Sequence, residues 1–213
     1  MTRFAILLGG DLTVTARLRA QLRGARVIAA DSGMMHAAAL RVVPELWVGD
    51  FDSAGSELTM QYRDVPRETF PADKDMTDGA IAVEEAIRRG ASEIVLLGGL
   101  GGQTDHTAGL LGQSIAIARQ GVACLLSSGV EEAWPLVPGR LHVDLPPETR
   151  LSIIPFGDLS GLGLSGVKWP LENRDVPVGS TLTLSNVALG PVEITLGQGY
   201  GIVIAYPPLG SDD

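Results

Sequence analysis

The stretch Trp47-Val48-Gly49-Asp50-Phe51-Asp52-Ser53 is an apolar run that ends in a glycine and is followed by two aspartates. Such a run is typical of a buried strand that leaves its sheet at a ligand crevice. Two carboxylates at positions i and i+2 of a turn can share one Mg²⁺ ion, because this ion prefers oxygen ligands. Alternatively, Asp50 caps a helix that begins near residue 54. The stretch alone leaves both interpretations open.

Short apolar runs alternate with helical patterns through the first 128 residues. The apolar runs predict strands at residues 4–8, 26–30, 46–49, 68–70, 94–97 and 122–126. The segments between them predict helices at residues 13–22, 34–40, 79–89 and 104–119, with Gly90 and Gly121 as stop signals. This alternation predicts an α/β domain with a mostly parallel sheet and helices on both faces.

Right-handed crossovers would place every strand-to-helix loop at the same edge of this sheet. Ligands of open α/β sheets bind at that edge, outside the carboxyl ends of the strands. Carboxylates gathered there would repel one another without a bound cation. The loops concerned are Gly9-Gly10-Asp11, Asp31-Ser32-Gly33, Asp50-Phe51-Asp52, the acidic segment 73–78 and the glycine-rich segment 98–105.

The character of the sequence changes near residue 139, where helical patterns stop and Pro, Gly, Ser and Thr become frequent. Short alternating segments predict strands at residues 141–145, 150–155, 162–169, 181–187, 192–196 and 201–205. They indicate a smaller all-β sandwich or barrel. We therefore expect an α/β domain at residues 1–128, a linker at 129–138 and a β-sandwich domain at 139–209.

Composition and charge exclude several classes of protein. The net charge is −9 and no Lys/Arg cluster occurs, which argues against a nucleic-acid surface and suits metal ions or cationic small molecules. No segment has the roughly 18 unbroken apolar residues of a membrane helix, and the N-terminus lacks a signal-peptide cleavage site. Cys124 lies in an apolar run and is interpreted as a core residue. We expect a soluble cytoplasmic protein.

The run Gly98-Gly99-Leu100-Gly101-Gly102 follows a predicted strand and opens a helix. Backbone N–H groups and the helix dipole could face a phosphate there, although glycines also serve tight turns. A Walker-type P-loop is excluded, because no Gly-x-x-x-x-Gly-Lys-[Ser/Thr] motif occurs. Asp105 and His106 follow the run, in positions where structural roles are also common.

Segment 73–78 places three acids, a lysine and a threonine within six residues. Asp78 is the candidate for a third metal carboxylate, and Lys74 could contact a phosphate as a point charge. The simpler interpretation is a solvated loop in which Thr77 caps the next helix.

In the second domain, Trp169 could be a platform for a cationic aromatic ring or a core residue at the rim of the sandwich.

Together these motifs resemble the thiamine pyrophosphokinase family. Each piece is short, but the set follows the family's order across almost the whole chain. The family's fold, an α/β domain followed by a β-sandwich, agrees with the architecture predicted above. The resemblance rests on Asp50-Phe51-Asp52-Ser53, Asp75-x-Thr77-Asp78, Gly101-Gly102-Gln103-Thr104-Asp105-His106, Ser165-Gly166-Val167-Lys168-Trp169-Pro170-Leu171 and Ser185-Asn186.

The resemblance implies transfer of the pyrophosphoryl group of ATP to the hydroxyl of thiamine, giving thiamine diphosphate and AMP. It implies Mg²⁺ ligands at Asp50, Asp52 and Asp78, with Asp31 in the same pocket. It also implies a homodimer, with each site built between the α/β domain of one subunit and the sandwich of the other. The implied substrate contacts are Asp75, Thr77, Gly101, Gly102, Gln103, Asp105, His106, Trp169, Ser185 and Asn186.

One position departs from the family pattern, because Gln103 stands where the family usually has Arg. A neutral amide cannot replace the charge of a guanidinium on a phosphate, so Lys74 or another base compensates, or the position matters less here. Either Asp31 or Asp75 could accept the hydroxyl proton. The alternative enzyme class is a Mg²⁺-dependent phosphohydrolase acting on a nucleotide or other small phosphate ester. A non-catalytic nucleotide- or thiamine-sensing module is the alternative outside enzymes.

Overall fold

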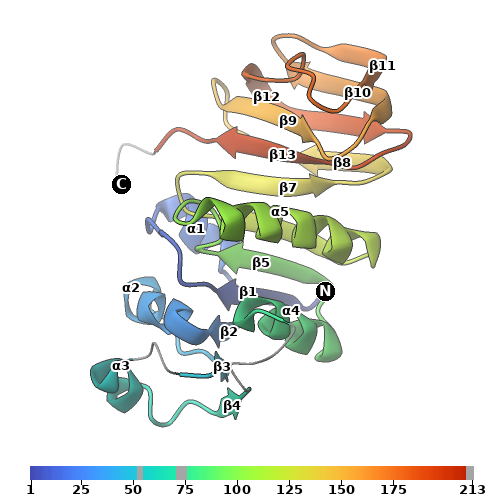
Figure 1. Ribbon diagram of the computed structural model, residues 1–213. Coiled ribbons are helices and arrows are strands. Elements are labelled where there is room, and N and C mark those ends of the chain that lie inside the picture. Colours follow the sequence, from blue (N-terminus) through green and yellow to red (C-terminus); the bar gives the residue numbers. More distant parts are fainter. Residues whose placement is uncertain (52–54, 71–75, 210–213) are drawn as a thin grey trace.

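The computed structural model describes residues 1–51, 55–70 and 76–209 (Figure 1). Its helical segments are α1 (Ala16–Gln21), the 3₁₀ helix η1 (Asp31–His36), α2 (Ala37–Leu40), α3 (Ser56–Gln61), α4 (Asp78–Arg88) and α5 (Thr104–Arg119). The strands of the first half are β1 (Arg3–Leu7), β2 (Arg26–Ala30), β3 (Leu46–Gly49), β4 (Arg67–Thr69), β5 (Glu93–Leu97) and β6 (Ala123–Ser127). Those of the second half are β7 (Glu132–Leu136), β8 (Gly139–Val143), β9 (Arg150–Pro155), β10 (Leu159–Val167), β11 (Leu171–Val176), β12 (Asn186–Leu196) and β13 (Gly201–Tyr206).

The first half is an α/β sheet in the order β4-β3-β2-β1-β5-β6, with every neighbouring pair parallel. Alternate residues of β1 belong to different cores, as expected for a strand covered on both sides. Phe4 and Ile6 share a core with residues of α4 and α5. Ala5 and Leu7 share a core with residues of α1 and α2. Because the strands are parallel, their carboxyl ends lie along one edge.

The sheet continues beyond the α/β half. Strand β7 pairs antiparallel with β6 on one side and with β13 on the other, and β9 and β12 follow (Figure 1). Segment 129–138, which we expected to be a linker, therefore contains a strand of the sheet. Four of the five residues of β7 are buried, and Ala133 and Leu136 belong to the cores of the first and second halves. The predicted architecture is correct in its coarse outline, but the sheet is mixed and continuous.

Strand β12 carries the chain from this sheet into a second layer. Its first residues, Asn186 and Val187, pair with β9, and its remainder pairs with β10 and β8. Strand β11 completes the second layer beside β10. Residues of both layers form one core that includes Ile153 and Leu162. The second half is thus a two-layer β structure built onto the edge strand of the first half.

Two predicted elements differ from the structure for local reasons. Residues 34–40, expected to be one helix, form the end of η1 and then α2, which stops where Arg41 adopts a φ of 58°. Residues 181–187, expected to be a strand, lie mostly in a turn, and Ser185 has a φ of 59° that an extended strand does not accommodate. Within the described ranges, no helix has both the length and the apolar character needed to cross a membrane.

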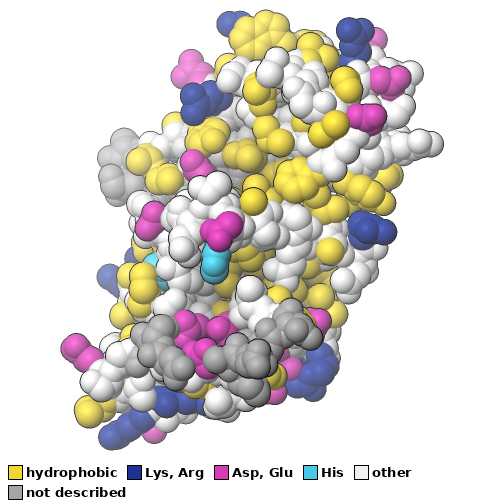
Figure 2. Space-filling model, in the orientation of Figure 1, with side chains coloured by type: hydrophobic (Ala, Val, Ile, Leu, Met, Phe, Trp, Pro, Cys, Tyr) yellow, Lys and Arg dark blue, Asp and Glu magenta, His cyan; other side chains and the backbone are white. Residues whose placement is uncertain are grey.

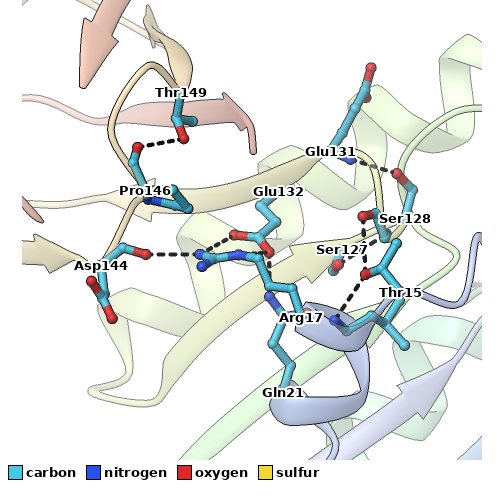
Figure 3. Close-up of polar contacts among 12 residues, drawn as sticks. Thr15, Arg17, Gln21, Ser127, Ser128, Glu131, Glu132, Asp144, Pro146 and Thr149 are labelled. Carbon is cyan, nitrogen blue, oxygen red and sulfur yellow. Dashed lines mark hydrogen bonds and ion pairs between the residues drawn. The ribbon is translucent and has the colours of Figure 1, made fainter. Parts of the chain in front are cut away.

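The loop after β1 is tied to the turn between β6 and β7 (Figure 3). The backbone N–H of Thr13 donates to the carbonyl oxygen of Ser128 at 2.8 Å. The hydroxyl of Thr15 donates to the carbonyl oxygen of Gly129 at 3.4 Å. A Cβ atom on Gly129 would lie 1.8 Å from the carbonyl oxygen of Thr13, so only glycine fits. Arg17 of α1 then pairs with Glu132 of β7. These contacts fix the start of α1 against the strand that joins the two halves.

Candidate functional site

A cavity of about 750 Å³ opens at the carboxyl ends of β1, β2 and β5. This size is typical of sites for small molecules. Figure 2 shows acidic side chains gathered on this face of the first half. No Lys or Arg lines the part of the cavity that the structure describes. The described lining consists of residues 8–11, 30–32, 76–80, 98–99, 101–103, 105–107, 109–110 and 113.

Two of the predicted acids, Asp31 and Asp78, line this cavity. Asp31 directly follows β2 and has a φ of 43°, and its carbonyl oxygen accepts a hydrogen bond of 2.8 Å from Nε1 of Trp47. Asp78 is the first residue of α4. Thr77 caps that helix, as the simpler interpretation predicted, because its hydroxyl accepts from the backbone N–H of Ala80 at 3.2 Å. Thr77 also lines the cavity, so the two interpretations of this residue are compatible.

Asp50 leaves the sheet directly after β3 and is half-buried. The next residue, Phe51, has a φ of 63°, and its ring meets that of Trp47 edge-on at 5.0 Å between centroids. The guanidinium of Arg67 lies 4.9 Å and 5.5 Å from these two ring centroids. This aromatic contact holds the turn that presents Asp50. The N-cap residue of α3 is Gly55, so the interpretation of Asp50 as a helix cap is wrong.

Asp50 and Asp31 leave neighbouring strands, and their backbones approach closely. A Cβ atom on Gly49, where φ is 154°, would lie 3.2 Å from Cα of Asp31. Asp52, Lys74 and Asp75 lie outside the described residues. Among the residues that are described, no group of three or more His, Cys, Asp and Glu side chains could hold a metal ion. The oxygen donors of Asp31, Asp50 and Asp78 nevertheless suit a hard cation such as Mg²⁺.

The loops after β1 and β5 interlock through their backbones. The N–H of Gly10 donates to the carbonyl oxygen of Gly98 at 3.1 Å, and a Cβ atom on Gly10 would lie 2.3 Å from that oxygen. Nε2 of the buried His36 lies 2.9 Å from the carbonyl oxygen of Gly10. Gly101 and Gly102 have φ values of 80° and 70°, which glycine adopts without strain. The turn interpretation thus explains these glycines, and their role as a phosphate cradle stays a prediction.

Three further predicted residues, Gln103, Asp105 and His106, line the cavity at the start of α5. Gln103 is the N-cap residue of α5, but its side chain makes no capping hydrogen bond. The carboxylate of Asp105 accepts from the backbone N–H of His106 at 2.9 Å. All three residues are exposed. The start of this long helix therefore combines its positive dipole end with an amide, a carboxylate and an imidazole.

Trp169, Ser185 and Asn186 do not occur in the described lining of the cavity. Nδ2 of Asn186 donates to the carbonyl oxygen of Trp169 at 2.7 Å, and the backbone N–H of Trp169 donates to Oδ1 of Asn186 at 3.2 Å. Ser185 directly precedes Asn186, and its N–H donates to the hydroxyl of Ser152 at 3.0 Å. The structure brings these residues together beside β10 and β12, which lie at the other end of the strand order from β2 and β3 (Figure 1).

Trp169 is not a core residue, because 53% of it is exposed. The ammonium group of Lys168 lies 4.7 Å from its ring centroid. An exposed indole face that already attracts one cation could also receive a cationic ring. The interpretation of Trp169 as a platform therefore fits the structure, whereas the interpretation as a buried rim residue is wrong.

Several lining residues were not among the predicted site residues. Asp11 lies in the loop after β1, which the sequence places at this edge of the sheet, but it was not singled out as a site residue. Gln113 lies seven residues after His106 on the same helix face, which the helical period could have revealed. His36, which lies outside the described lining but contacts the carbonyl oxygen of Gly10, carries no such signal, because this contact depends on how two loops meet. Ser32 and Met76 lie in segments that the sequence places at this edge, whereas Gly109 and Leu110 lie on α5 beyond the predicted positions.

The structure confirms that Cys124 is a core residue. It is 7% exposed, and burial raises the pKa of its thiol to about 12. Because the thiolate is the reactive form of cysteine, this residue contributes no nucleophile near neutral pH.

Comparisons with known proteins agree with this arrangement. Residues 21–126 match the catalytic domain of thiamin pyrophosphokinase, and residues 140–200 match the vitamin B1 binding domain of the same family. Thiamine pyrophosphokinase of Bacillus subtilis (strain 168) is 29% identical over 167 residues, which cover 75% of this chain and 76% of that protein. The crystal structure of thiamine pyrophosphokinase from Bacillus subtilis covers 98% of this chain and 100% of its own, with a TM-score of 0.87 at 24% identity. Thiamin pyrophosphokinase from Candida albicans shares the fold at 13% identity, with a TM-score of 0.81, covering 97% of this chain and 89% of its own. Because the matched domains lie in order along most of the chain, this chain belongs to the thiamin pyrophosphokinase family.

Proposed function

We propose that this chain transfers the pyrophosphoryl group of ATP to the hydroxyl of thiamine, forming thiamine diphosphate and AMP. The observation that carries the proposal is the cavity where Asp31, Asp78 and the start of α5 meet, in a chain that matches both domains of one family. Residues 1–128 would bind ATP and the metal, and residues 139–209 would bind thiamine. The sheet that runs through both halves would keep the two binding regions of one subunit in fixed positions.

Mg²⁺ would be held by Asp50, Asp52 and Asp78, with Asp31 beside them. When bound, the ion would neutralise phosphate charge and polarise the transferred group. The described lining supports this requirement, because it contains several carboxylates and no Lys or Arg. Lys74 would add a positive charge, which matters because Gln103 cannot supply one.

The chain's own residues would mainly position the reactants, since transfer of phosphoryl-type groups depends on alignment and charge neutralisation. The backbone of Gly101 and Gly102 and the first turn of α5 would face the phosphates, with Gln103, Asp105 and His106 beside them. Thr77 keeps Asp78 at the cavity through its helix cap. Asp31 or Asp75 would accept the proton of the thiamine hydroxyl.

Thiamine would be presented by Trp169, Ser185 and Asn186 of a second subunit in a homodimer. This assignment is supported by the exposure of Trp169 and by its place near β10, at the far end of the strand order from β2 and β3. Asn186 bonds both backbone polar groups of Trp169 and so holds its backbone in place. The positive thiazolium ring of thiamine suits an aromatic platform.

The proposal is tested by incubating the protein with ATP and Mg²⁺, with and without thiamine. AMP and thiamine diphosphate that appear in equal amounts, and only when thiamine is present, would support it. Phosphate release without an acceptor would instead indicate the phosphohydrolase. Binding of both substrates without any turnover would indicate the sensing module.

A further inference from the structure

Most glycines that line the cavity are explained by the fold itself. Gly10 and Gly98 lie where a Cβ atom would come within 2.3 Å and 2.5 Å of backbone oxygens. Gly101 and Gly102 have positive φ values. Gly9 is also crowded, because its Cβ atom would lie 2.1 Å from the hydroxyl oxygen of Ser32. At these positions, the close approach of neighbouring chain segments or the backbone conformation itself favours glycine.

Gly109 has neither explanation. It lies inside α5, where its backbone is helical, and a Cβ atom added to it would meet nothing within 4 Å. Glycine weakens a helix interior relative to alanine, so this position gives up helix stability without any packing gain in the chain. Gly109 is exposed and lines the cavity. A side chain at this position would therefore project into open space at the cavity wall.

The neighbours of Gly109 indicate what could occupy that space. Leu110 and Met76 supply apolar surface in the same lining, and Gln113 supplies an amide one helical turn further along. In the described part of the chain, no hydrogen bond to the Gln113 side chain is formed by another residue. A flat group could lie against the bare backbone at Gly109. Polar atoms at its edge would then lie near the side-chain amide of Gln113, which can both donate and accept hydrogen bonds.

We propose that Gly109 is a specificity-determining position that admits the heteroaromatic ring of a substrate against α5, with Gln113 bonding the edge of the ring. The inference rests on the proposed function, which supplies two candidate rings, the adenine of ATP and the aminopyrimidine of thiamine. Both are planar and carry ring nitrogens and an amino group. A leucine at position 109 would fill the space that the ring needs.

Gly112 provides a matched control. It also lies inside α5, and a Cβ atom added to it would meet nothing within 4 Å, but it does not occur in the described lining of the cavity. Gly109→Ala and Gly112→Ala should both raise the melting temperature, because alanine is the better helix former. Gly109→Leu should raise the KM for one of the substrates by about tenfold or more, as expected when a bulky side chain fills a binding pocket, with a smaller change in kcat. Gly112→Leu should leave both KM values close to those of the unchanged protein.

The substrate whose KM rises identifies the ring, since ATP and thiamine can be varied separately. Isothermal calorimetry with ATP–Mg²⁺ and with thiamine repeats the comparison without turnover, so it tests the ring site even if transfer activity is absent. The inference is overturned if Gly109→Leu folds and binds both ligands as tightly as the unchanged protein. It is also overturned if Gly112→Leu weakens binding to the same extent, because the effect would then belong to the helix surface and not to the cavity. If the leucine variant does not fold, the same calorimetric comparison is made with Gly109→Ala and Gly112→Ala. The methyl group at position 109 should then weaken binding of one ligand, and unchanged binding of both overturns the inference.

Discussion

The carboxylate of Glu132 is 2% exposed, and Arg17 satisfies both of its oxygens, at 2.6 Å and 2.8 Å (Figure 3). Arg17 also donates to the carbonyl oxygen of Asp144 at 2.9 Å, so it joins α1 to the second half of the chain. Removing the guanidinium would leave the carboxylate of Glu132 buried without its positively charged partner. We expect Arg17→Met to lower the free energy of unfolding by about 3–5 kcal/mol, measured by urea denaturation.

Two controls accompany this prediction. The double variant Arg17→Met/Glu132→Leu should recover much of the loss, because apolar side chains can replace a buried ion pair. Arg26→Met removes an exposed partner of Glu45 and should cost much less. Equal losses for Arg17→Met and Arg26→Met would show that burial of Glu132 does not determine the effect.

Asp50 and Asp78 should be needed for turnover and not for thiamine binding. Each change to Asn keeps the shape but removes a charged metal ligand, so we expect kcat to fall by about a hundredfold or more, as when other electrostatic groups are removed from active sites. Initial rates against Mg²⁺ concentration measure the effect, and calorimetry measures thiamine binding. Asp64→Asn, at an exposed position in the turn after α3, is the control. Unchanged turnover in Asp50→Asn would remove Asp50 from the metal site.

Mixing two inactive variants tests whether the site is shared between subunits. Asp50→Asn damages the α/β half and Trp169→Ala damages the sandwich. If the partner subunit supplies Trp169, a mixed dimer contains one site with both residues intact, and part of the activity returns after subunit exchange. Two variants that exchange subunits, as shown by differently tagged chains, and yet stay inactive would contradict the shared site.

Stability at low pH should depend on Glu45 and Glu85, which join the start of β3 to the end of α4 through Arg89. The hydrogen bond from Arg26 lowers the pKa of Glu45, with help from Arg89. Burial acts to raise the pKa of Glu85, but hydrogen bonds from Arg88 and Arg89 outweigh it, so that this pKa is also lowered.

A carboxyl group whose pKa is lowered by folding stabilises the fold at pH values above its ordinary pKa. This contribution is lost as the pH falls through the pKa that the group has in the folded protein. The free energy of unfolding should therefore decrease as the pH drops below the ordinary value of 4.5. In Glu45→Gln/Glu85→Gln this decrease should be shallower, measured by denaturation at a series of pH values. A decrease of the same steepness in both proteins would assign the acid sensitivity to other carboxylates.

The sequence predicts those parts of the fold in which a local pattern is decisive. The strands at 46–49 and 150–155 and the helix at 104–119 match the structure to the residue, because apolar periodicity and Gly stops coincide there. Strand β11 was missed because Leu171–Val176 is polar and mostly exposed at the edge of its layer. The role of segment 129–138 was missed because a strand between two halves looks the same locally as an apolar connection.

The candidate site divides in a similar way. Asp31 and Asp78 could be predicted, because parallel strands bring their carboxyl ends together whatever the details of packing. Phe51 could not, since its role depends on the contact with Trp47 across the end of the sheet. Asp52, Lys74 and Asp75 lie outside the described residues, so their place in the site stays a prediction.

Strand β7 has a consequence for how the protein comes apart. Because it is bonded to β6 on one side and to β13 on the other, a hinge between the halves would have to break a sheet ladder. The chain should therefore melt in one cooperative transition, although it carries two binding functions. Expressed without residues 129–209, the α/β half would leave β6 as a bare edge, which is a template for aggregation.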